Sequence, residues 1–249
     1  MLVIEQAKAI ALKLNNPQRV MECIPTAKKL NHNGNDLTIV PHKPDEVRVL
    51  RNLGIKAPAP IMHYYDWPGE FTPYEHQRLT SAFLTMNDKA LVLNEIGTGK
   101  THSALWSADY LMKQGVIKKV LIISPLSTLE RVWGDAIFKG LIQRTSVTLH
   151  GTSKRRRKLL KTDVDFYIVN HDGFAIICDE AVGMFDLVIV DEAAIYRNPS
   201  TNKFKVFRKW LAMHPNMRLW LMTGTPTPNV PTDAWALAKL VDSPYAPRT

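Results

Sequence analysis

The chain has 249 residues, of which 45% are hydrophobic and 22% are charged, so it can form one large globular domain or one domain with a small appendage. Its formal net charge of +9 suits an anionic partner such as nucleic acid, although charge alone is weak evidence. Cys23 and Cys178 lie far apart in the sequence, which argues against a disulfide framework or a zinc site. No apolar run is long enough to cross a bilayer, and residues 1–14 lack a signal-peptide core, so we expect a cytoplasmic protein with no membrane partner.

The first 70 residues are expected to form a small accessory region of α+β type. Apolar residues recur at helical spacing over residues 2–14, which predicts a helix. The polar segment 31–36 predicts the turn of a small hairpin, and residues 44–53 predict a short helix that Gly54 ends. Residues 57–73 contain four prolines and predict an irregular connector with an aromatic cluster formed by Tyr64, Tyr65 and Trp67.

The pattern changes at residue 71. The sequence Thr72-Pro73-Tyr74-Glu75 predicts a helix that Thr72 caps and that runs to about Met86. Six continuous apolar runs follow, separated by helical stretches, which is typical of strands buried on both faces of a parallel sheet. The runs are 90–93, 120–123, 146–149, 166–169, 187–190 and 219–222. Residues 71–249 therefore predict a doubly wound, mainly parallel α/β fold with its ligands at the carboxyl ends of the strands.

The first of these runs leads into a glycine-rich turn, Asn94-Glu95-Ile96-Gly97-Thr98-Gly99-Lys100-Thr101. Glycines let backbone N–H groups curl around an anion, and the N-terminus of the next helix adds a partial positive charge. In such a turn Lys100 can reach the terminal phosphates of a nucleotide, and Thr101 can hold Mg²⁺. Asn94 stands where the full P-loop pattern has glycine, so a plain strand-to-helix turn is the alternative.

Two further strand ends carry polar residues. The run 187–190 ends in Asp191-Glu192; a strand-end aspartate helps to hold Mg²⁺ in P-loop NTPases, and Glu192 is placed to orient or deprotonate an attacking water. The alternative is an ordinary acidic helix cap. The run 219–222 ends in Thr223-Gly224-Thr225-Pro226. Its hydroxyls could bond the γ-phosphate region or the two acids, although the same residues form ordinary turns.

Together these segments resemble the first RecA-like lobe of superfamily 2 helicases and DNA translocases, closest to the Swi/Snf-like branch. The resemblance covers about residues 71–242, with the motifs in the order of that branch. Residues 1–70 vaguely resemble N-terminal extensions of phage-encoded relatives, and a phage protein would act in the host cytoplasm. The matching segments are 71–77 for the adenine-recognising motif, 94–101 for motif I, 124–129 with Trp133 for motif Ia, 169–172 for the next DNA-side motif, 191–194 for motif II and 223–226 for motif III.

The resemblance implies a motor lobe that binds ATP and Mg²⁺ and couples ATP hydrolysis to movement on DNA. Gln77 would read the adenine edge, with Phe71 or Tyr74 packing nearby. The phosphates would lie against Gly97, Thr98, Gly99, Lys100 and Thr101, and Thr101 and Asp191 would hold Mg²⁺. Lys100, Asp191 and Glu192 would carry the chemistry, and Thr223, Gly224 and Thr225 would take part in coupling.

The resemblance also implies a nucleic-acid face for double-stranded or branched DNA. Ser124, Thr128 and Asn170 would lie on it, together with the basic run Lys154-Arg155-Arg156-Arg157-Lys158. We expect that run to begin a helix capped by Ser153, and a merely solvated helix face is its alternative. Contacts to the phosphate backbone carry no sequence information, so no sequence preference is expected.

Two departures from the family pattern affect these expectations. Motif II has Ala194 where many relatives carry histidine, so coupling would use other groups. The chain ends soon after motif III, so we expect the second RecA-like lobe, with its arginine fingers, to belong to a longer chain or a partner, and turnover by this lobe alone to be weak. A nucleotide-binding regulatory or nucleic-acid-binding protein without motor activity is the alternative function. A small-molecule kinase is disfavoured because it would not need Gln77 or the segment 223–226.

Overall fold

The computed structural model describes residues 1–225 and 233–241. The chain divides into two compact units, Met1–Asp66 and Trp67–Thr249. The sequence led us to expect a division near residue 70. Among the described residues, no helix is both long and apolar enough to span a membrane.

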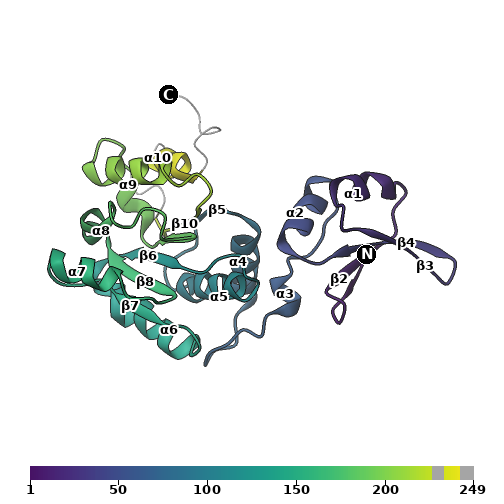
Figure 1. Cartoon of the computed structure of the whole chain (residues 1–249), viewed down its shortest axis with the longest axis horizontal. Helices are drawn as coiled ribbons and strands as arrows, with labels where there is room; N and C mark the ends of the chain where they lie inside the picture. Colours follow the sequence, from purple (N-terminus) through teal and green to yellow (C-terminus); the bar gives the residue numbers. More distant parts are fainter. Residues whose placement is uncertain (226–232, 242–249) are drawn as a thin grey trace. The chain divides into compact units, whose positions relative to one another are not determined.

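The first unit is a four-stranded antiparallel sheet with three short helices (Figure 1). The strands lie in the order β1-β2-β4-β3, and Val20 of α1 and Val47 and Leu50 of α2 are buried in its core. The bounds are β1 (Leu2–Ile4), β2 (Ala9–Leu12), α1 (Pro17–Cys23), β3 (Lys28–His32), β4 (Asn35–Pro41), α2 (Pro44–Asn52) and α3 (Ile61–Tyr64).

The predicted helix over residues 2–14 is wrong, because this segment forms the antiparallel pair β1 and β2. Lys8 adopts a positive φ of 45° and its N–H donates to the carbonyl of Glu5 at 3.1 Å, which turns the chain between the strands. Every residue of β2 is buried. Short apolar runs of this length do not distinguish helix from strand, and burial against β4 decides in favour of the strand.

Two other predictions for this unit agree with the structure. The hairpin is confirmed, with Asn33 and Gly34 at φ of 49° and 76° in its turn, as the left-handed turns of tight hairpins require. The helix before Gly54 is confirmed as α2. Tyr64 packs on His42 at a ring distance of 5.2 Å within this unit, whereas Trp67 begins the second unit and packs there on Trp106 at 5.7 Å. The predicted aromatic cluster of Tyr64, Tyr65 and Trp67 therefore stays a prediction.

The second unit contains a six-stranded sheet in which every pairing is parallel, in the order β5-β10-β9-β6-β8-β7. The chain runs outward from β5 through β6 to β7 and then returns, so this is a doubly wound sheet as predicted. All six predicted strands are present. Their bounds are β5 (Lys89–Val92), β6 (Val120–Ser124), β7 (Ser146–Thr148), β8 (Phe166–Asn170), β9 (Leu187–Val190) and β10 (Arg218–Met222).

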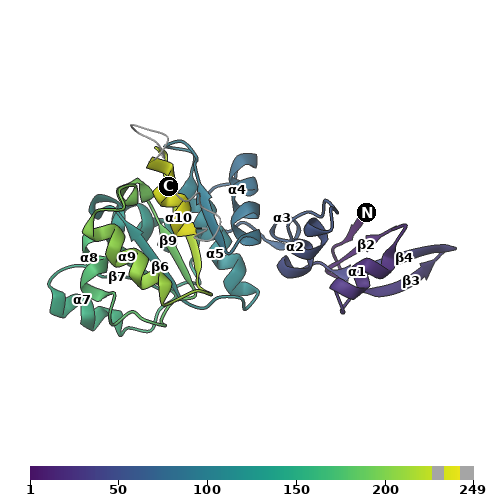
Figure 2. The same cartoon turned by 90° about the horizontal axis from the view of Figure 1, so that it is seen from above.

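Helices cover both faces of this sheet (Figure 2). On one face, alternate strand residues such as Val169 and Val190 pack with Phe174, Phe207 and Leu237 from three helices. The opposite face receives α5 and α6, and α4 packs against α5. The bounds are α4 (Glu75–Met86), α5 (Lys100–Lys113), α6 (Asp135–Gly140), α7 (Ser153–Leu160), α8 (His171–Ile177), α9 (Asn202–Ala212) and α10 (Asp233–Val241).

The start of α4 differs from the prediction. The helix begins at Glu75 and not after Thr72, and Tyr74 occupies the N-cap position. Gln77 replaces the expected threonine cap, because its Oε1 accepts the N–H of Tyr74 at 3.0 Å. A polar side chain at the third helical position can satisfy the cap N–H in this way, so the helix forms without Thr72.

Candidate nucleotide-binding site

The glycine-rich turn lies at the carboxyl end of β5 and opens α5. Gly97 and Gly99 have φ of 82° and 78°, values that a residue with a β-carbon adopts only under strain. Thr98 closes the turn by donating its hydroxyl to the carbonyl of Glu95 at 2.8 Å. The backbone therefore makes the curled geometry that a phosphate cradle needs.

Lys100 is the buried cation of this turn, with 9% of its surface exposed. Its Nζ donates to the carbonyl oxygens of Asn94 at 2.9 Å and Glu95 at 2.8 Å. The ammonium thus lies inside the loop and is held there by neutral acceptors. Phosphate oxygens carry full negative charge and form the stronger charge-assisted bonds, so they would compete well for the same donor.

Asn94 stands where the P-loop pattern has glycine, and it makes two hydrogen bonds. Its side-chain amide donates to the hydroxyl of Thr80 on α4 at 3.0 Å, while its carbonyl accepts from Lys100. The side chain joins the turn to α4. Asparagine is therefore compatible with the cradle at this position.

Gln77 joins the start of α4 to the same turn. Its Nε2 donates to the carbonyl of Thr98 at 3.2 Å, and a β-carbon added at Gly99 would overlap that nitrogen. A ring nitrogen of His76 lies 3.1 Å from the same carbonyl. Gln77, the predicted adenine reader, thus contacts residues 94–101, the predicted phosphate turn.

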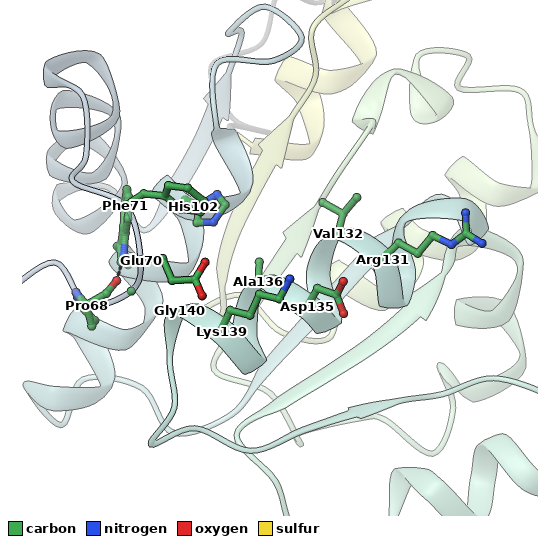
Figure 3. A pocket seen from close by; sticks show the side chains of 12 residues that line it. Pro68, Glu70, Phe71, His102, Arg131, Val132, Asp135, Ala136, Lys139 and Gly140 are labelled. Atoms are coloured by element: carbon green, nitrogen blue, oxygen red, sulfur yellow. Dashed lines mark hydrogen bonds between the residues drawn. The ribbon is translucent and has the colours of Figure 1, made fainter.

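The two predicted aromatic neighbours are both exposed. Phe71 is 63% exposed and meets His102 edge-on at 5.9 Å, whereas Tyr74 is 70% exposed and stacks on His76 at 5.7 Å. A cavity of about 260 Å³ opens beside Phe71, lined by His102 and Trp106 from α5 and by Asp135 and Lys139 from α6 (Figure 3). Burial lowers the pKa of His102, which favours the neutral ring.

The acidic pair follows β9, two strands away from the turn. Asp191 is 9% exposed, and burial raises the pKa of its carboxyl, while hydrogen bonds from Trp133 and the Glu192 N–H and the positive charge of Lys100 oppose that rise. Trp133 Nε1 donates to Oδ2 at 3.1 Å, and the N–H of Glu192 donates to Oδ1 at 3.1 Å. Glu192 itself has φ 49° and ψ 49°, a left-handed conformation that is uncommon outside glycine and concentrates at functional sites.

These donors fit a magnesium ion bound together with a nucleotide. Mg²⁺ takes oxygen ligands and is commonly held by one or two protein oxygens, water and the phosphates of the substrate. Asp191 offers a carboxylate whose oxygens each have one protein donor, which leaves lone pairs for a metal. Among the described residues, no group of three or more histidine, cysteine, aspartate or glutamate side chains could hold a metal ion.

The segment after β10 lies between the turn and the acidic pair, because β10 pairs with both β5 and β9. Thr223 is fully buried, its N–H donates to the carbonyl of Val92, and its Oγ1 accepts the N–H of Thr225 at 3.2 Å. A β-carbon at Gly224 would stand 2.9 Å from Ile96 Cγ1 and 3.5 Å from the carbonyl oxygen of Asn94. This segment therefore packs directly on the phosphate turn. Pro226, also predicted to belong to it, lies outside the described residues.

The predicted DNA-side residues meet at the ends of β6 and β8. Ser124 and Asn170 are opposite each other in the parallel register. Ser124 is fully buried and its Oγ accepts the hydroxyl of Thr128 at 3.3 Å. Asn170 is 9% exposed, and its Oδ1 accepts from Arg156 Nη1 at 3.0 Å. These polar groups form two hydrogen-bonded pairs at the ends of β6 and β8, and β6 also pairs with β9, which precedes the acidic pair.

The basic run forms α7, capped by Thr152 and not by Ser153, since the Thr152 hydroxyl accepts the N–H of Arg155 at 3.3 Å. Arg156 does not share the exposed face with its neighbours. It is buried and donates to the carbonyls of Leu149 and Gly151 as well as to Asn170. Arg157 pairs with Glu180 at 2.7 Å, and Lys154, Arg155 and Lys158 are exposed.

Comparison with known proteins decides the family. The family model of the SNF2-related domain matches residues 55–246, which is more than half of the chain. The chain belongs to the SNF2-related family. The Swi/Snf-like resemblance inferred from the motifs is thus confirmed.

Several relatives share the SNF2-related region. The chain is 29% identical over 181 residues to "Putative protein p41" of Acyrthosiphon pisum secondary endosymbiont phage 1, covering 69% of this chain and 39% of the relative. It is 26% identical over 259 residues to "Protein CHROMATIN REMODELING 24" of Arabidopsis thaliana, covering 95% of this chain and 22% of the relative. The chain therefore spans well under half the length of these relatives.

A solved structure shares the SNF2-related fold. It is described as "Sulfolobus solfataricus SWI2/SNF2 ATPase core in complex with dsDNA", with a TM-score of 0.60 and 19% identity over 71% of this chain and 37% of that one. A likeness at this identity shows the fold, and it confirms the predicted RecA-like architecture of the six-stranded unit.

Two residues of the SNF2-related unit were not predicted to lie at the acidic pair. The sequence resemblance placed Trp133 in motif Ia, yet its indole N–H donates a hydrogen bond to Asp191, which lies 58 residues further along the chain. No local sequence pattern predicts such a contact. His171 is buried with its Nδ1 3.4 Å from the hydroxyl of Tyr196, which follows motif II, and burial lowers its pKa to about 4. The only available signal was their position next to family motifs.

Proposed function

We propose that residues 67–249 form the ATP-binding motor lobe of an ATP-dependent DNA translocase. The observation that carries this proposal is the meeting of the phosphate turn, the Thr223 segment and the acidic pair at neighbouring strand ends, β5, β10 and β9. The positive charge of Lys100 opposes the rise in the pKa of the Asp191 carboxyl, which supports placing both residues at one site. Membership of the SNF2-related family supports the same conclusion.

In this proposal the start of α4, the glycine-rich turn and the acidic pair bind ATP together. Gln77, Phe71 and Tyr74 receive the adenine, and Gly97, Thr98 and Gly99 direct backbone N–H groups at the phosphates. Lys100 neutralises phosphate charge, and Thr101 and Asp191 would hold Mg²⁺, which would supply further positive charge to the phosphate oxygens. Glu192, held beside Asp191, orients or deprotonates the attacking water.

We propose further that DNA lies across the ends of β6 and β8. Ser124 and Asn170, also predicted to face DNA, are buried there and hydrogen-bond Thr128 and Arg156. Thr128 is half-buried at the surface, and the exposed Lys154, Arg155 and Lys158 of α7 add positive charge. Such contacts reach phosphates and not base edges, so binding is independent of sequence. A second RecA-like lobe, from a longer chain or a partner, would complete the ATP site with an arginine finger, a contribution of about 10³–10⁵ in rate.

The test is displacement of a third strand from a DNA triplex by the full natural polypeptide that contains this sequence. A translocase strips the third strand from the duplex in an ATP-dependent way without needing to separate the duplex. We expect displacement with ATP, none with Lys100→Ala, and normal displacement with Lys118→Ala, an exposed lysine at the opposite edge of the sheet. ATP binding without displacement would instead indicate a nucleotide-binding regulator.

A further inference from the structure

The indole of Trp133 holds one oxygen of the Asp191 carboxylate. Trp133 is fully buried, and its Nε1 donates to Oδ2 at 3.1 Å. The other oxygen, Oδ1, accepts the N–H of Glu192 at 3.1 Å, and the N–H of Asp191 itself donates to the carbonyl of Ile123. One donor on each oxygen fixes the plane of the carboxylate and leaves the remaining lone pairs in a set direction.

The element that carries Trp133 is unusual. Residues Leu129–Gly134 form a π-helix, η2, between a 3-10 turn, η1 (Leu126–Thr128), and α6. The N–H of Asp135 bonds the carbonyl of Glu130, five residues back. π-helical turns are rare and occur mostly at functional sites. The wide turn directs Trp133 into the interior toward Asp191, while its neighbours Arg131 and Val132 remain exposed.

The outer side of η2 faces the proposed DNA region. Glu130 and Arg131 line a hollow of about 350 Å³ together with Ser127, Thr148 and His150. In Figure 3, Arg131 extends away from the Phe71 and His102 side of the neighbouring cavity. One short element therefore has a surface on the DNA side and an interior hydrogen bond to the acidic pair. Ala194 of motif II offers no polar side chain for this connection.

We infer that Trp133 is a positioning residue that holds the Asp191 carboxylate in the orientation that binds Mg²⁺ together with the nucleotide. This inference rests on the proposed function, because it gives Asp191 the task of a metal ligand. Trp133 touches neither nucleotide nor metal and acts only through its N–H. Groups that orient a metal ligand in this way affect metal affinity by about 10–100-fold when they are removed.

The test measures how Mg²⁺ changes the affinity for a fluorescent ATP analogue, in the chain as it stands. Trp133→Phe keeps an aromatic ring but has no N–H. We expect its affinity for nucleotide in EDTA to match the unmodified chain and its apparent affinity for Mg²⁺ to fall about ten-fold. The matched control is Trp210→Phe, because Trp210 is equally buried and its indole nitrogen has no hydrogen-bond partner among the described residues. We expect the apparent affinity of this control for Mg²⁺ to equal that of the unmodified chain.

A second variant covers the case in which Trp133→Phe does not fold. β-(3-Benzothienyl)alanine at position 133 keeps the fused ring and replaces the N–H with sulfur, so packing is preserved. An unchanged Mg²⁺ effect in a folded variant without the N–H would overturn the inference and leave the proposed function standing. If the unmodified chain bound no nucleotide, the proposed function would fail and the inference with it.

Discussion

The side-chain amide of Gln77 lies against Gly99, so closely that a β-carbon at position 99 would overlap Gln77 Nε2. The helix that precedes the sheet and the phosphate turn are therefore in contact before any nucleotide binds. Glycine at position 99 is needed twice, for its φ of 78° and for the space that Gln77 occupies.

Replacing Gly99 with alanine should abolish measurable nucleotide binding, because the displaced Gln77 and the distorted turn are both parts of the site. The matched control is Gly115→Ala just after α5, which has a similar φ of 72° but nothing within 4 Å of an added β-carbon. We expect both variants to lose about 1 kcal/mol from backbone strain and Gly99→Ala to lose more. Chemical denaturation and titration with ATP check the two effects, and equal ATP affinity in both variants would contradict the contact.

Replacing Gln77 with alanine should lower the preference for ATP over GTP and destabilise the start of α4. We expect the preference to fall because the amide that is proposed to read the base is lost, and stability to fall by about 1 kcal/mol because the N–H of Tyr74 loses its acceptor. Gln114→Ala, at the exposed end of α5, is the control for both readouts. A stability loss with unchanged selectivity would mean that Gln77 serves only as a cap.

Much of this site follows from sequence because its signals are local. The apolar runs before Asp191 and Thr223 predict buried parallel strands, and the carboxyl ends of such strands meet at one edge. Contacts such as Trp133 with Asp191 were not predictable, because they depend on how distant segments pack. Residues 2–14 were misassigned for the same reason, since burial of β2 against β4 and not local spacing decides their structure.

The sequence of α7 predicted its positive charge but not which of its side chains are buried. Arg156→Ala should destabilise the fold by about 3 kcal/mol, since the carbonyls of Leu149 and Gly151 and the side chain of Asn170 lose a buried charged donor. Thermal or chemical unfolding measures this loss. Arg157→Ala should cost little, because the Arg157–Glu180 pair is largely exposed.

The double variant Lys154→Ala with Arg155→Ala should leave stability unchanged and weaken DNA binding. If both side chains contact phosphates, the slope of log affinity against log salt should become shallower by about 2, because each contact contributes about 0.9. Fluorescence anisotropy at several salt concentrations measures the slope. An unchanged slope would show that Lys154 and Arg155 face solvent and do not contact DNA phosphates.

Acid should destabilise the first unit through His42. Burial lowers the pKa of His42 from 6.5, and its ring bonds the hydroxyl of Tyr64 and the carbonyl of Pro58. As pH falls through about 6.5, the unfolded chain takes up a proton that the folded unit does not, so the free energy of unfolding falls. Denaturation at pH 7.5 and 5.5 should show this loss, and His42→Gln should reduce it. NMR titration of the His42 ring checks the direction, and a pKa above 6.5 would contradict it.

The most direct test of the motor assignment is ATP hydrolysis by the full natural polypeptide containing residues 1–249, measured with and without double-stranded DNA. The proposed function predicts hydrolysis that DNA stimulates, that Lys100→Ala removes and that Lys118→Ala leaves intact. Hydrolysis that ignores DNA, or tight ATP binding with no turnover in the presence of DNA, would contradict the assignment.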